Sequence, residues 1–370
     1  MFVLLRLYFL AFCGNTIFWI LRPLLTVYVR DLGFSALLVG ALSSAFMSGR
    51  GLFSVLIGIL SDRLKNRKLF VIAGFFIFSL ASYLISVSKK SYEFLLSSFL
   101  LGVASGSVWP VVQTMVVESV DSVKAGRSLS IYFNCGAMGR ILGNFLLAQL
   151  SALFSGNRIF FFCALFYVLP FCISCFISDT YKEKVKPESS FASGSFLWFF
   201  IIIFLVGWIM GRAMIILYLK ERFLMSTSDI AYVLMILSVV TIPLSYIISW
   251  VFDRNMRAGF LLLSSLLFLG VFLPLAGTKY LFVILLSLWF SGTSSFFSIS
   301  RAYISRMSKN VGSAIGVLNT VSNAGTAIGP LFLGYIYDLF PKGSPLTMIG
   351  YSILSFVVCA GIWLTILKKR

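Results

Sequence analysis

The chain has 370 residues, of which 59% are hydrophobic, 16% aromatic and only 11% charged, and its mean hydropathy is +1.00. It contains no histidine, and its formal net charge is +18. A soluble globule needs far more polar surface than this composition supplies, so the chain must use a lipid bilayer as its solvent.

Apolar runs of roughly 20 residues recur along the whole chain, and a helix of that length crosses a hydrocarbon layer about 30 Å thick. A strand barrel would instead show segments of about 10 alternating residues. The first run continues beyond residue 20 without a small-residue cleavage site, so we expect a span and not a cleaved signal peptide. We predict an all-α membrane protein with twelve transmembrane helices at residues 3–29, 36–60, 69–88, 92–117, 128–152, 158–178, 196–219, 229–252, 259–277, 280–304, 313–338 and 345–367.

An even number of spans places both termini on one side of the membrane. If that side is the cytoplasm, eighteen lysines and arginines fall in cytoplasmic loops and ends, and eight fall outside. Loops rich in lysine and arginine stay in the cytoplasm, so we predict a multi-pass protein of the cell membrane with both termini cytoplasmic. The positive charge then faces anionic lipid headgroups, and no nucleic acid is needed to explain it.

The longest polar gap, residues 179–195, is predicted to be a cytoplasmic linker between two six-helix bundles at 1–178 and 196–370. The bundles look like copies of one another. Near their starts, an offset of 190 or 191 places Arg22 over Arg212 and Asp62-Arg63 over Asp253-Arg254. Further on, an offset of 186 superposes four glycine pairs: Gly106 and Gly292, Gly126 and Gly312, Gly139 and Gly325, Gly143 and Gly329. These matches indicate an internal duplication.

Glycines also recur at close spacing within two of the spans. We expect them to form small-residue faces along which helix backbones approach closely. These are Gly136, Gly139 and Gly143 in the fifth span and Gly325, Gly329 and Gly334 in the eleventh.

The segment Gly58-Ile-Leu-Ser-Asp62-Arg63-Leu-Lys-Asn-Arg67-Lys68 resembles the signature loop between the second and third spans of the major facilitator superfamily. A weaker copy contains Asp253 and Arg254, and Gly329-Pro330 begins a segment similar to the family's eleventh span. The resemblance covers the whole chain and implies two pseudo-symmetric bundles that transport a solute by alternating access. It also implies a gating role for five residues: Asp62, Arg63, Arg67, Asp253 and Arg254.

The signature loop has a physical task that the residue types suggest. Asp62 lies at a helix end, where its carboxylate is expected to face the positive N-terminus of a helix from the other half. The loop is one residue longer than usual, with Lys65-Asn66 in place of its glycine, and we expect Asn66 to take the left-handed conformation, which asparagine tolerates. Ser98 stands where many proton-coupled members carry arginine, so the resemblance does not support proton coupling.

Four arginines lie well inside spans and away from their ends, namely Arg22, Arg50, Arg140 and Arg212, whereas all twelve acidic residues map to loops or span ends. An unpaired arginine at depth costs at least about 3 kcal/mol, so these arginines call for a wet cavity and an anionic partner. Arg22 and Arg212 are related by the repeat and are predicted to face one another as a clamp, because a guanidinium fork fits carboxylate or phosphate oxygens. The alternative is structural: each arginine could reach the interface or donate to freed backbone carbonyls.

Amide and aromatic residues on the same spans complete the predicted substrate-binding set. They are Asn15, Trp19, Gln113, Asn319 and Asn323. The spans contain no histidine, no nucleophile beside a base and no set of metal ligands, so we expect neither an enzyme nor a cofactor or metal.

These observations favour a monomeric secondary transporter that moves a small organic anion, a phosphate ester or a carboxylate, by exchange or facilitated diffusion. Two alternatives remain open at this stage. The 39 phenylalanines suggest an efflux pump for amphipathic compounds. A lipid flippase could use the same arginines to hold a phosphate headgroup.

The predicted topology can be tested by labelling single cysteines with a membrane-impermeant thiol reagent. Cysteines at Lys184 and at the C-terminus should react only from the cytoplasmic side, and one at Lys90 only from outside, because the lysine and arginine bias fixes the orientation. Labelling of positions 90 and 184 from the same side would contradict the twelve-span prediction.

Overall fold

The structure is a computed structural model and describes residues 2–120, 122–181, 197–307 and 311–364. Within these ranges the secondary structure is helical, and no strand is present. Ten helices of the described chain are long and apolar enough to cross a membrane. Most of the predicted linker, residues 182–195, lies outside the described residues.

The first six predicted spans correspond to helices whose ends lie within a few residues of those expected, except that the fifth begins six residues early. They are α1 (Phe2–Asp31), α2 (Ala36–Arg63), α3 (Lys68–Val87), α4 (Ser91–Glu118), α5 (Ser122–Leu153) and the pair α6 (Gly156–Phe166) and α7 (Val168–Cys175). The last span of this set is interrupted at Tyr167. Pro170 explains the interruption, because it has no N–H to donate to the carbonyl of Phe166.

The last six spans follow the same pattern. They are α8 (Leu197–Ile209) with α9 (Ala213–Arg222), α10 (Thr227–Arg254), α11 (Met256–Phe268) with η2 (Leu269–Leu275), α12 (Lys279–Met307), α13 (Val311–Asp338), and η3 (Pro345–Met348) with α14 (Ile349–Ile362). Taken with the first six, these elements confirm the prediction of an all-helical protein with twelve spans. Helices α5 and α13 are not among the ten helices that are long and apolar enough to cross a membrane. Both carry glycine, serine and asparagine along their length.

The seventh span is broken between α8 and α9. Gly211 lies in the break, where its carbonyl accepts a hydrogen bond from the hydroxyl of Tyr351. A Cβ atom at Gly211 would lie 2.5 Å from the ring of Pro330, so only glycine fits there. Arg212 is the next residue, and it occupies the N-cap position of α9.

The helices pack into two compact units. The first comprises Met1–Phe34, Ala45–Val185 and Thr227–Met235, and the second comprises Ser35–Ser44, Lys186–Ser226 and Ile236–Arg370. We propose residues 1–178 and 196–370 as the two sequence repeats. The packing units differ from these repeats because the first turns of α2 belong to the second unit and those of α10 to the first.

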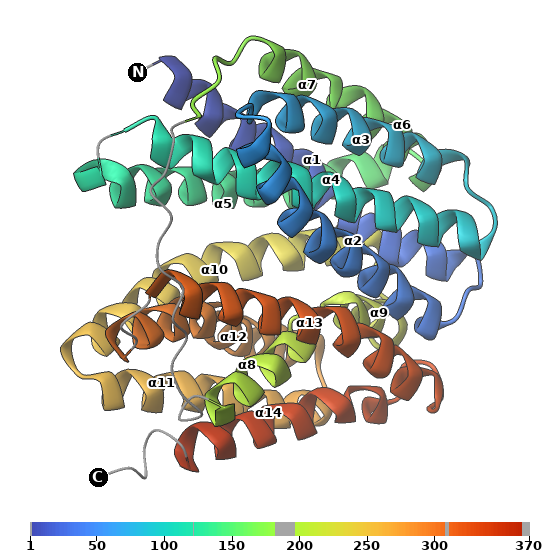
Figure 1. Cartoon of the computed structure of the whole chain (residues 1–370). Helices are drawn as coiled ribbons and strands as arrows, with labels where there is room; N and C mark the ends of the chain where they lie inside the picture. Colours follow the sequence, from blue (N-terminus) through green and yellow to red (C-terminus); the bar gives the residue numbers. More distant parts are fainter. Residues whose placement is uncertain (1, 121, 182–196, 308–310, 365–370) are drawn as a thin grey trace. The chain divides into compact units, whose positions relative to one another are not determined.

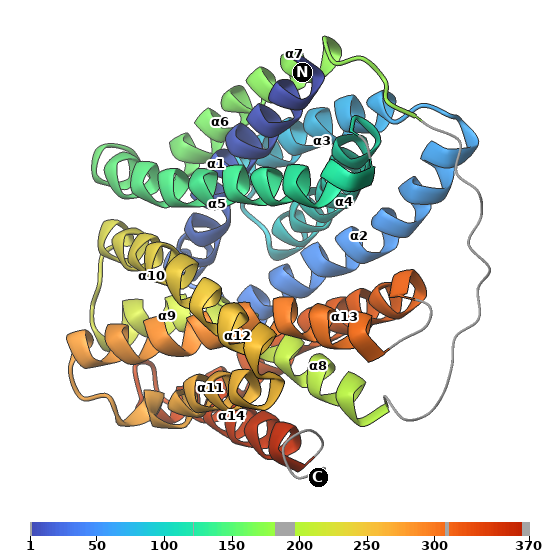
Figure 2. The same cartoon turned by 90° about the vertical axis from the view of Figure 1, so that its left-hand side faces the viewer.

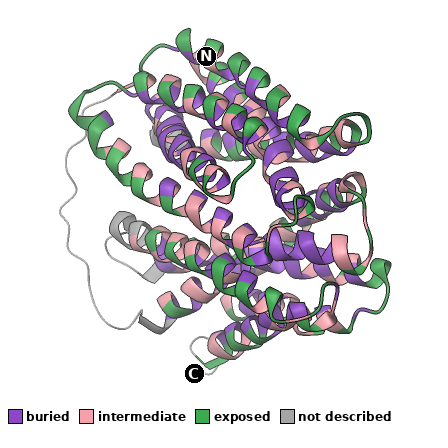
Figure 3. Ribbon diagram, turned by 90° about the vertical axis from the view of Figure 1, so that its right-hand side faces the viewer, coloured by how far each residue is buried: buried purple, intermediate pink, exposed green. Residues whose placement is uncertain are grey.

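Within the first unit, α1 packs along α5 and α3 packs along α4, as Figures 1 and 2 show from two directions. Within the second unit, α13 packs along α8, and α14 packs against both α8 and α11. In each unit the buried residues face neighbouring helices, and the exposed residues, many of them large and apolar, lie on the outward sides (Figure 3). Apolar outward faces are expected of helices that contact lipid.

Glycines set the closest helix contacts in both units, as predicted. A Cβ atom at Gly139 would lie 2.4 Å from the backbone oxygen of Phe12, and one at Gly143 would lie 2.3 Å from that of Thr16, so α5 and α1 touch along their backbones. The matching glycines of the second repeat behave alike. A Cβ atom at Gly325 would lie 2.2 Å from the backbone oxygen of Phe204 on α8. One at Gly329 would lie 2.3 Å from the Cα atom of Trp208 on the same helix.

The first turns of α2 and α10 are each fixed by a polar contact within their unit. The carboxylate of Asp338 accepts hydrogen bonds from the backbone N–H groups of Ala36 at 2.9 Å and Leu37 at 2.7 Å. These N–H groups have no partner inside α2, so the carboxylate satisfies them and complements the positive helix end. The hydroxyl of Ser228 at the start of α10 donates to the backbone oxygen of Ala148 at 2.9 Å.

The signature loop forms a charged cluster at the end of the first unit. Arg67, only 3% exposed, donates to both oxygens of Glu118 at 2.7 and 2.8 Å and to Asp62 at 2.9 Å. Burial alone would lower the pKa of the Arg67 guanidinium, but hydrogen bonds and charge from Glu118 and then Asp62 raise it. Asp179 caps the start of α3 by accepting from the backbone N–H groups of Arg67 and Lys68.

The left-handed residue of this loop differs from the one expected. Lys65 adopts φ 50°, whereas Asn66 does not have a positive φ. The asparagine instead uses its side-chain oxygen to accept from the backbone N–H of Leu69 at 3.0 Å. An asparagine side chain competes well for such a local bond, which leaves the left-handed position to its neighbour.

The ion pair of Arg67 and Glu118 supports a first stability prediction. Glu118→Gln should lower the free energy of unfolding by about 3 kcal/mol, because it leaves a buried guanidinium without its compensating charge. The measurement is a reversible unfolding titration of the purified protein in detergent.

Asp62→Asn is the matched control, since it neutralises the other partner of the same arginine. The Asp62 side chain is 63% exposed, so its loss should cost under about 1 kcal/mol. Equal losses in the two variants would show that the buried pair does not hold the loop.

Candidate functional site

A cavity of about 360 Å³ lies inside the first unit, among α1, α2, α4 and α5. This volume is at the lower end of the range usual for small-molecule sites. Twelve residues line it, and aromatic and polar side chains dominate: Asn15, Phe18, Trp19, Arg50, Ser105, Trp109, Gln113, Tyr132, Phe133, Gly136, Ala137 and Arg140.

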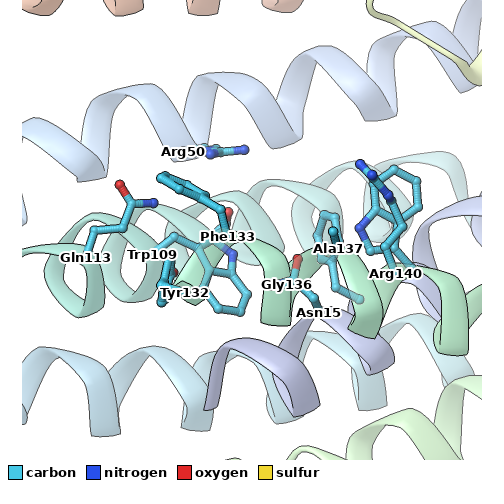
Figure 4. A pocket seen from close by; sticks show the side chains of 12 residues that line it. Asn15, Arg50, Trp109, Gln113, Tyr132, Phe133, Gly136, Ala137 and Arg140 are labelled. Carbon is cyan, nitrogen blue, oxygen red and sulfur yellow. The ribbon is translucent and has the colours of Figure 1, made fainter. Parts of the chain in front are cut away.

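Five of the nine predicted substrate-binding residues meet at this cavity: Asn15, Trp19, Arg50, Gln113 and Arg140. They come from four helices and are far apart in the sequence. In Figure 4, Gln113 and Arg140 lie at opposite ends of the cavity, and Arg50 lies above the aromatic side chains between them. The cavity therefore offers two guanidinium groups, two amides and a set of rings to one occupant.

Close backbone contacts hold these side chains in place. On one side, Gly139 and Gly143 press α5 against α1, which fixes Asn15 and Trp19 beside Arg140. On the other side, a Cβ atom at Gly106 of α4 would lie 2.7 Å from the backbone oxygen of Arg50. The backbone of α2 is thus fixed at the residue that carries the second guanidinium.

The two cavity arginines have different surroundings. The guanidinium carbon of Arg140 lies 5.7 Å from the centre of the Trp19 ring, and its Nε is buried without a hydrogen-bond partner in the described chain. Arg50 is close enough to Arg22 for the two charges to repel one another. Like charges brought together in a membrane interior favour the binding of an anion between or beside them.

Arg22 itself does not line the cavity. Its guanidinium carbon lies 4.3 Å from the centre of the Phe46 ring, a cation–π contact that offsets part of the cost of its burial. The Arg22 side chain therefore lies against Phe46 of α2 and is not one of the residues that line the cavity.

Sequence reasoning did not select several residues that form the cavity walls, among them Phe18, Ser105, Phe133 and Ala137. The Tyr132 side chain is 4% exposed and hydrogen-bonds with that of Gln113. One signal was available, because residues 133, 137 and 140 follow helical spacing and must share a face of α5. Starting from Arg140, this spacing would have identified Ala137 and Phe133 as residues on the same face of the helix.

The second unit holds the other predicted residues. Arg212 lies in the break of the seventh span, with its guanidinium carbon 3.8 Å from the centre of the Phe290 ring. Asn319 accepts a hydrogen bond from Arg301 at 3.1 Å, and Asn323 is half-buried on α13. Arg301 lies three residues before the predicted end of its span, and it is inside α12 because that helix continues to Met307. The opposition of Arg22 and Arg212 stays a prediction, since they belong to different units.

The remaining predicted gating residues lie at helix ends. Arg63 ends α2 and is exposed, and Asp253 and Arg254 end α10. The guanidinium carbon of Arg254 lies 3.7 Å from the centre of the Trp250 ring. In this structure Asp62 contacts Arg67 of its own unit, and the expected contact with a helix of the other half stays a prediction.

Twelve transmembrane spans in two sets of six, with a polar cavity among four of them, are typical of a polytopic solute transporter. The sequence model of the Major Facilitator Superfamily matches residues 7–330 and 197–370. The chain belongs to this superfamily.

Curated relatives agree with this assignment. The chain is 23% identical over 338 residues to an uncharacterized MFS-type transporter of Methanocaldococcus jannaschii, which covers 86% of this chain and 87% of the relative. It is 24% identical over 394 residues to the quinolone resistance protein NorA of Staphylococcus aureus, covering 96% of this chain and 95% of the relative. A match of 30% over 149 residues to the multidrug resistance protein MdtG of Enterobacter lignolyticus covers 39% of this chain and 35% of the relative.

Solved structures share the fold. The structure matches a bacterial homologue of the human lysosomal transporter Spinster, described as inward-facing and occupied, with a TM-score of 0.86 at 12% identity, over 100% of this chain and 98% of that one. It matches the nucleoside transporter NupG with a TM-score of 0.80 at 14% identity, over 100% of this chain and 100% of that one. At these identities the likeness concerns the fold alone.

The contact between α1 and α5 supports a second prediction. Gly139→Ala should lower the free energy of unfolding by about 1–3 kcal/mol, because the new methyl group overlaps a backbone oxygen that cannot move aside. Gly51→Ala is the control, since nothing lies within 4 Å of a Cβ atom there, and replacing a helical glycine should stabilise by about 0.5–1 kcal/mol. Detergent unfolding titrations of both variants provide the measurement, and equal effects would contradict the close approach.

Proposed function

We propose that the protein is an alternating-access carrier for a small organic anion and that the cavity of the first unit forms part of its substrate site. The observation that carries this proposal is the presence of Arg50 and Arg140 on one cavity inside the membrane-spanning part of the chain. Guanidinium groups remain charged at any physiological pH and bind carboxylate or phosphate oxygens in pairs. An anion is the partner that lowers the cost of holding them there.

The walls of the cavity indicate what the anion should carry. Trp19, Trp109, Tyr132 and Phe133 present rings to the occupant, and rings favour an apolar or aromatic body. A small inorganic anion would leave these surfaces unfilled. We therefore propose an organic anion with an apolar portion, in preference to phosphate alone.

Export of amphipathic compounds is the second candidate, and a specific observation favours it. A relative aligned over nearly the whole chain is named as a quinolone resistance protein, and another is named as a multidrug resistance protein. The two candidates overlap, because an amphipathic organic anion would satisfy both the cavity and these relatives. The direction of transport distinguishes the two candidates. An exchanger moves substrate across the membrane in both directions, whereas a pump accumulates substrate on one side.

Exchange or facilitated diffusion is the mode that the residues favour. The chain has no histidine, and Ser98 occupies the position of the arginine found in many proton-coupled members. A carrier of this kind needs two six-helix bundles that rock about a central site. In that scheme Arg22 and Arg212 would complete the site from their two repeats, and Asp62 with its neighbours would close the cytoplasmic side.

The proposal predicts the effect of conservative substitutions at the cavity. Arg140→Lys and Arg50→Lys should each weaken binding of a carboxylate or phosphate ester about 10- to 150-fold, because an ammonium keeps the charge but cannot form the bidentate contact. Thermal-shift screening of phosphate esters, carboxylates and inorganic anions identifies the anion, and titration of the purified variants measures affinity. Arg127→Lys is the control on the same helix, since Arg127 is exposed and lies outside the cavity.

The same titration on Arg22→Lys and Arg212→Lys tests the predicted clamp. Each variant should lose affinity for the anion by a similar factor. If the anion affinity of all four lysine variants stays within about twofold of the wild type, the arginines are structural and the substrate is uncharged. Movement of fluorescent phospholipid between leaflets of proteoliposomes, without transport of any soluble anion, would support the flippase alternative instead.

A further inference from the structure

Asn144 lies on α5 one turn after Arg140, and no part of its side chain is exposed. Both polar atoms of its amide, Oδ1 and Nδ2, lack a hydrogen-bond partner in the part of the chain that the structure describes. Exchanging the two atoms by turning the amide over would not change this. A buried amide with neither its donor nor its acceptor satisfied is costly, so Asn144 favours a polar partner that is not part of the described chain.

Asn144 is not itself among the twelve lining residues, but helical spacing aligns it with those that α5 contributes to the cavity. Phe133, Ala137 and Arg140 all line it, and residues 133, 137, 140 and 144 follow the pattern i, i+4, i+7 and i+11 that forms one stripe on a helix. Asn144 is therefore the next position of this stripe beyond Arg140.

The surroundings fix the asparagine where it is. The adjacent Gly143 has its backbone against α1, where an added Cβ would lie 2.3 Å from the oxygen of Thr16 and 3.1 Å from the Cβ of Trp19. The helix therefore cannot rotate to bring the amide to another partner. One turn earlier, the Nε of Arg140 is also buried and without a partner among the described residues.

We propose that Arg140 and Asn144 form a composite subsite for an oxyanion that carries a hydrogen-bond donor next to its charge. The oxyanion accepts hydrogen bonds from Arg140 Nε and from the Asn144 amide nitrogen. A hydroxyl or N–H group on the neighbouring carbon donates to Asn144 Oδ1. The substrate class is thus a hydroxy acid or acylamino acid, and the aromatic walls of the cavity favour one with an aromatic body.

This inference rests on the proposed function and narrows its substrate class. It assigns Asn144 a role in specificity, because an anion without the donor would leave the amide oxygen unsatisfied. Sites that hydrogen-bond a substrate hydroxyl discriminate strongly against the analogue that lacks it. A water molecule alone in the subsite would give no such discrimination.

The test compares 3-phenyllactate with 3-phenylpropionate, which differ only in the hydroxyl beside the carboxylate. Their dissociation constants are measured by calorimetry on the full-length protein in lipid nanodiscs. The wild type should bind 3-phenyllactate about tenfold more tightly, the effect expected of one buried hydrogen bond. Asn144→Leu, which keeps the volume but removes the amide, should reduce this preference to within about twofold.

Two further measurements separate a specificity role from a structural one. The thermal stability of unliganded Asn144→Leu should equal or exceed that of the wild type, because the variant removes an unsatisfied amide. Asn144→Asp should weaken both probes at least about tenfold, since its carboxylate would occupy the guanidinium of Arg140.

The possible failures are distinguishable. If neither probe nor any other anion binds the wild type, the proposed function fails and this inference fails with it. If anions bind but neither phenyl probe does, or the hydroxyl gives no preference, or Asn144→Leu retains the preference, only this inference is overturned. A marked loss of stability in unliganded Asn144→Leu would also overturn it, because the amide would then be paired inside the protein.

Discussion

The contact on which the cavity of the first unit depends is the close backbone approach between α1 and α5 at Gly139 and Gly143. Two helices that touch along their backbones have little freedom to slide or rotate, because any shift brings main-chain atoms into overlap. Side chains that flank the contact then have fixed positions. Trp19 on α1 and Arg140 and Asn144 on α5 flank it, so the polar end of the cavity depends on two residues that have no side chain.

The second unit repeats this contact between α8 and α13 through Gly325 and Gly329, yet it surrounds its arginine differently. Arg22 lies within the continuous helix α1, whereas Arg212 caps the second half of a broken helix. A broken span frees backbone groups inside the membrane, and here the hydroxyl of Tyr351 satisfies one of them. The two halves therefore share the glycine packing but hold their corresponding arginines in different local structures.

Charge in an apolar medium connects the fold with the proposed function. The chain manages its buried cations in two ways. Arg67 is neutralised by Glu118 at a helix end, which is a structural solution. Arg22 and Arg140 lie against aromatic rings, and Arg140 keeps a buried Nε without a partner in the described chain. A ring offsets less of the desolvation cost than a carboxylate does, and this difference supports the proposal that Arg140 binds an anion.

The sequence by itself determined the helical fold, the twelve spans, the repeat and the family, because hydropathy and glycine spacing are local properties that a bilayer enforces directly. It also selected Arg50 and Arg140, since a cation without an acidic neighbour in a span is visible in the sequence. Only the tertiary structure decided which candidates meet. It left Arg22 out of the cavity lining, broke the seventh span at Gly211, and showed Asn144 buried without a partner among the residues described. Those outcomes depend on helix rotation and on contacts between distant segments, which spacing along one chain does not specify.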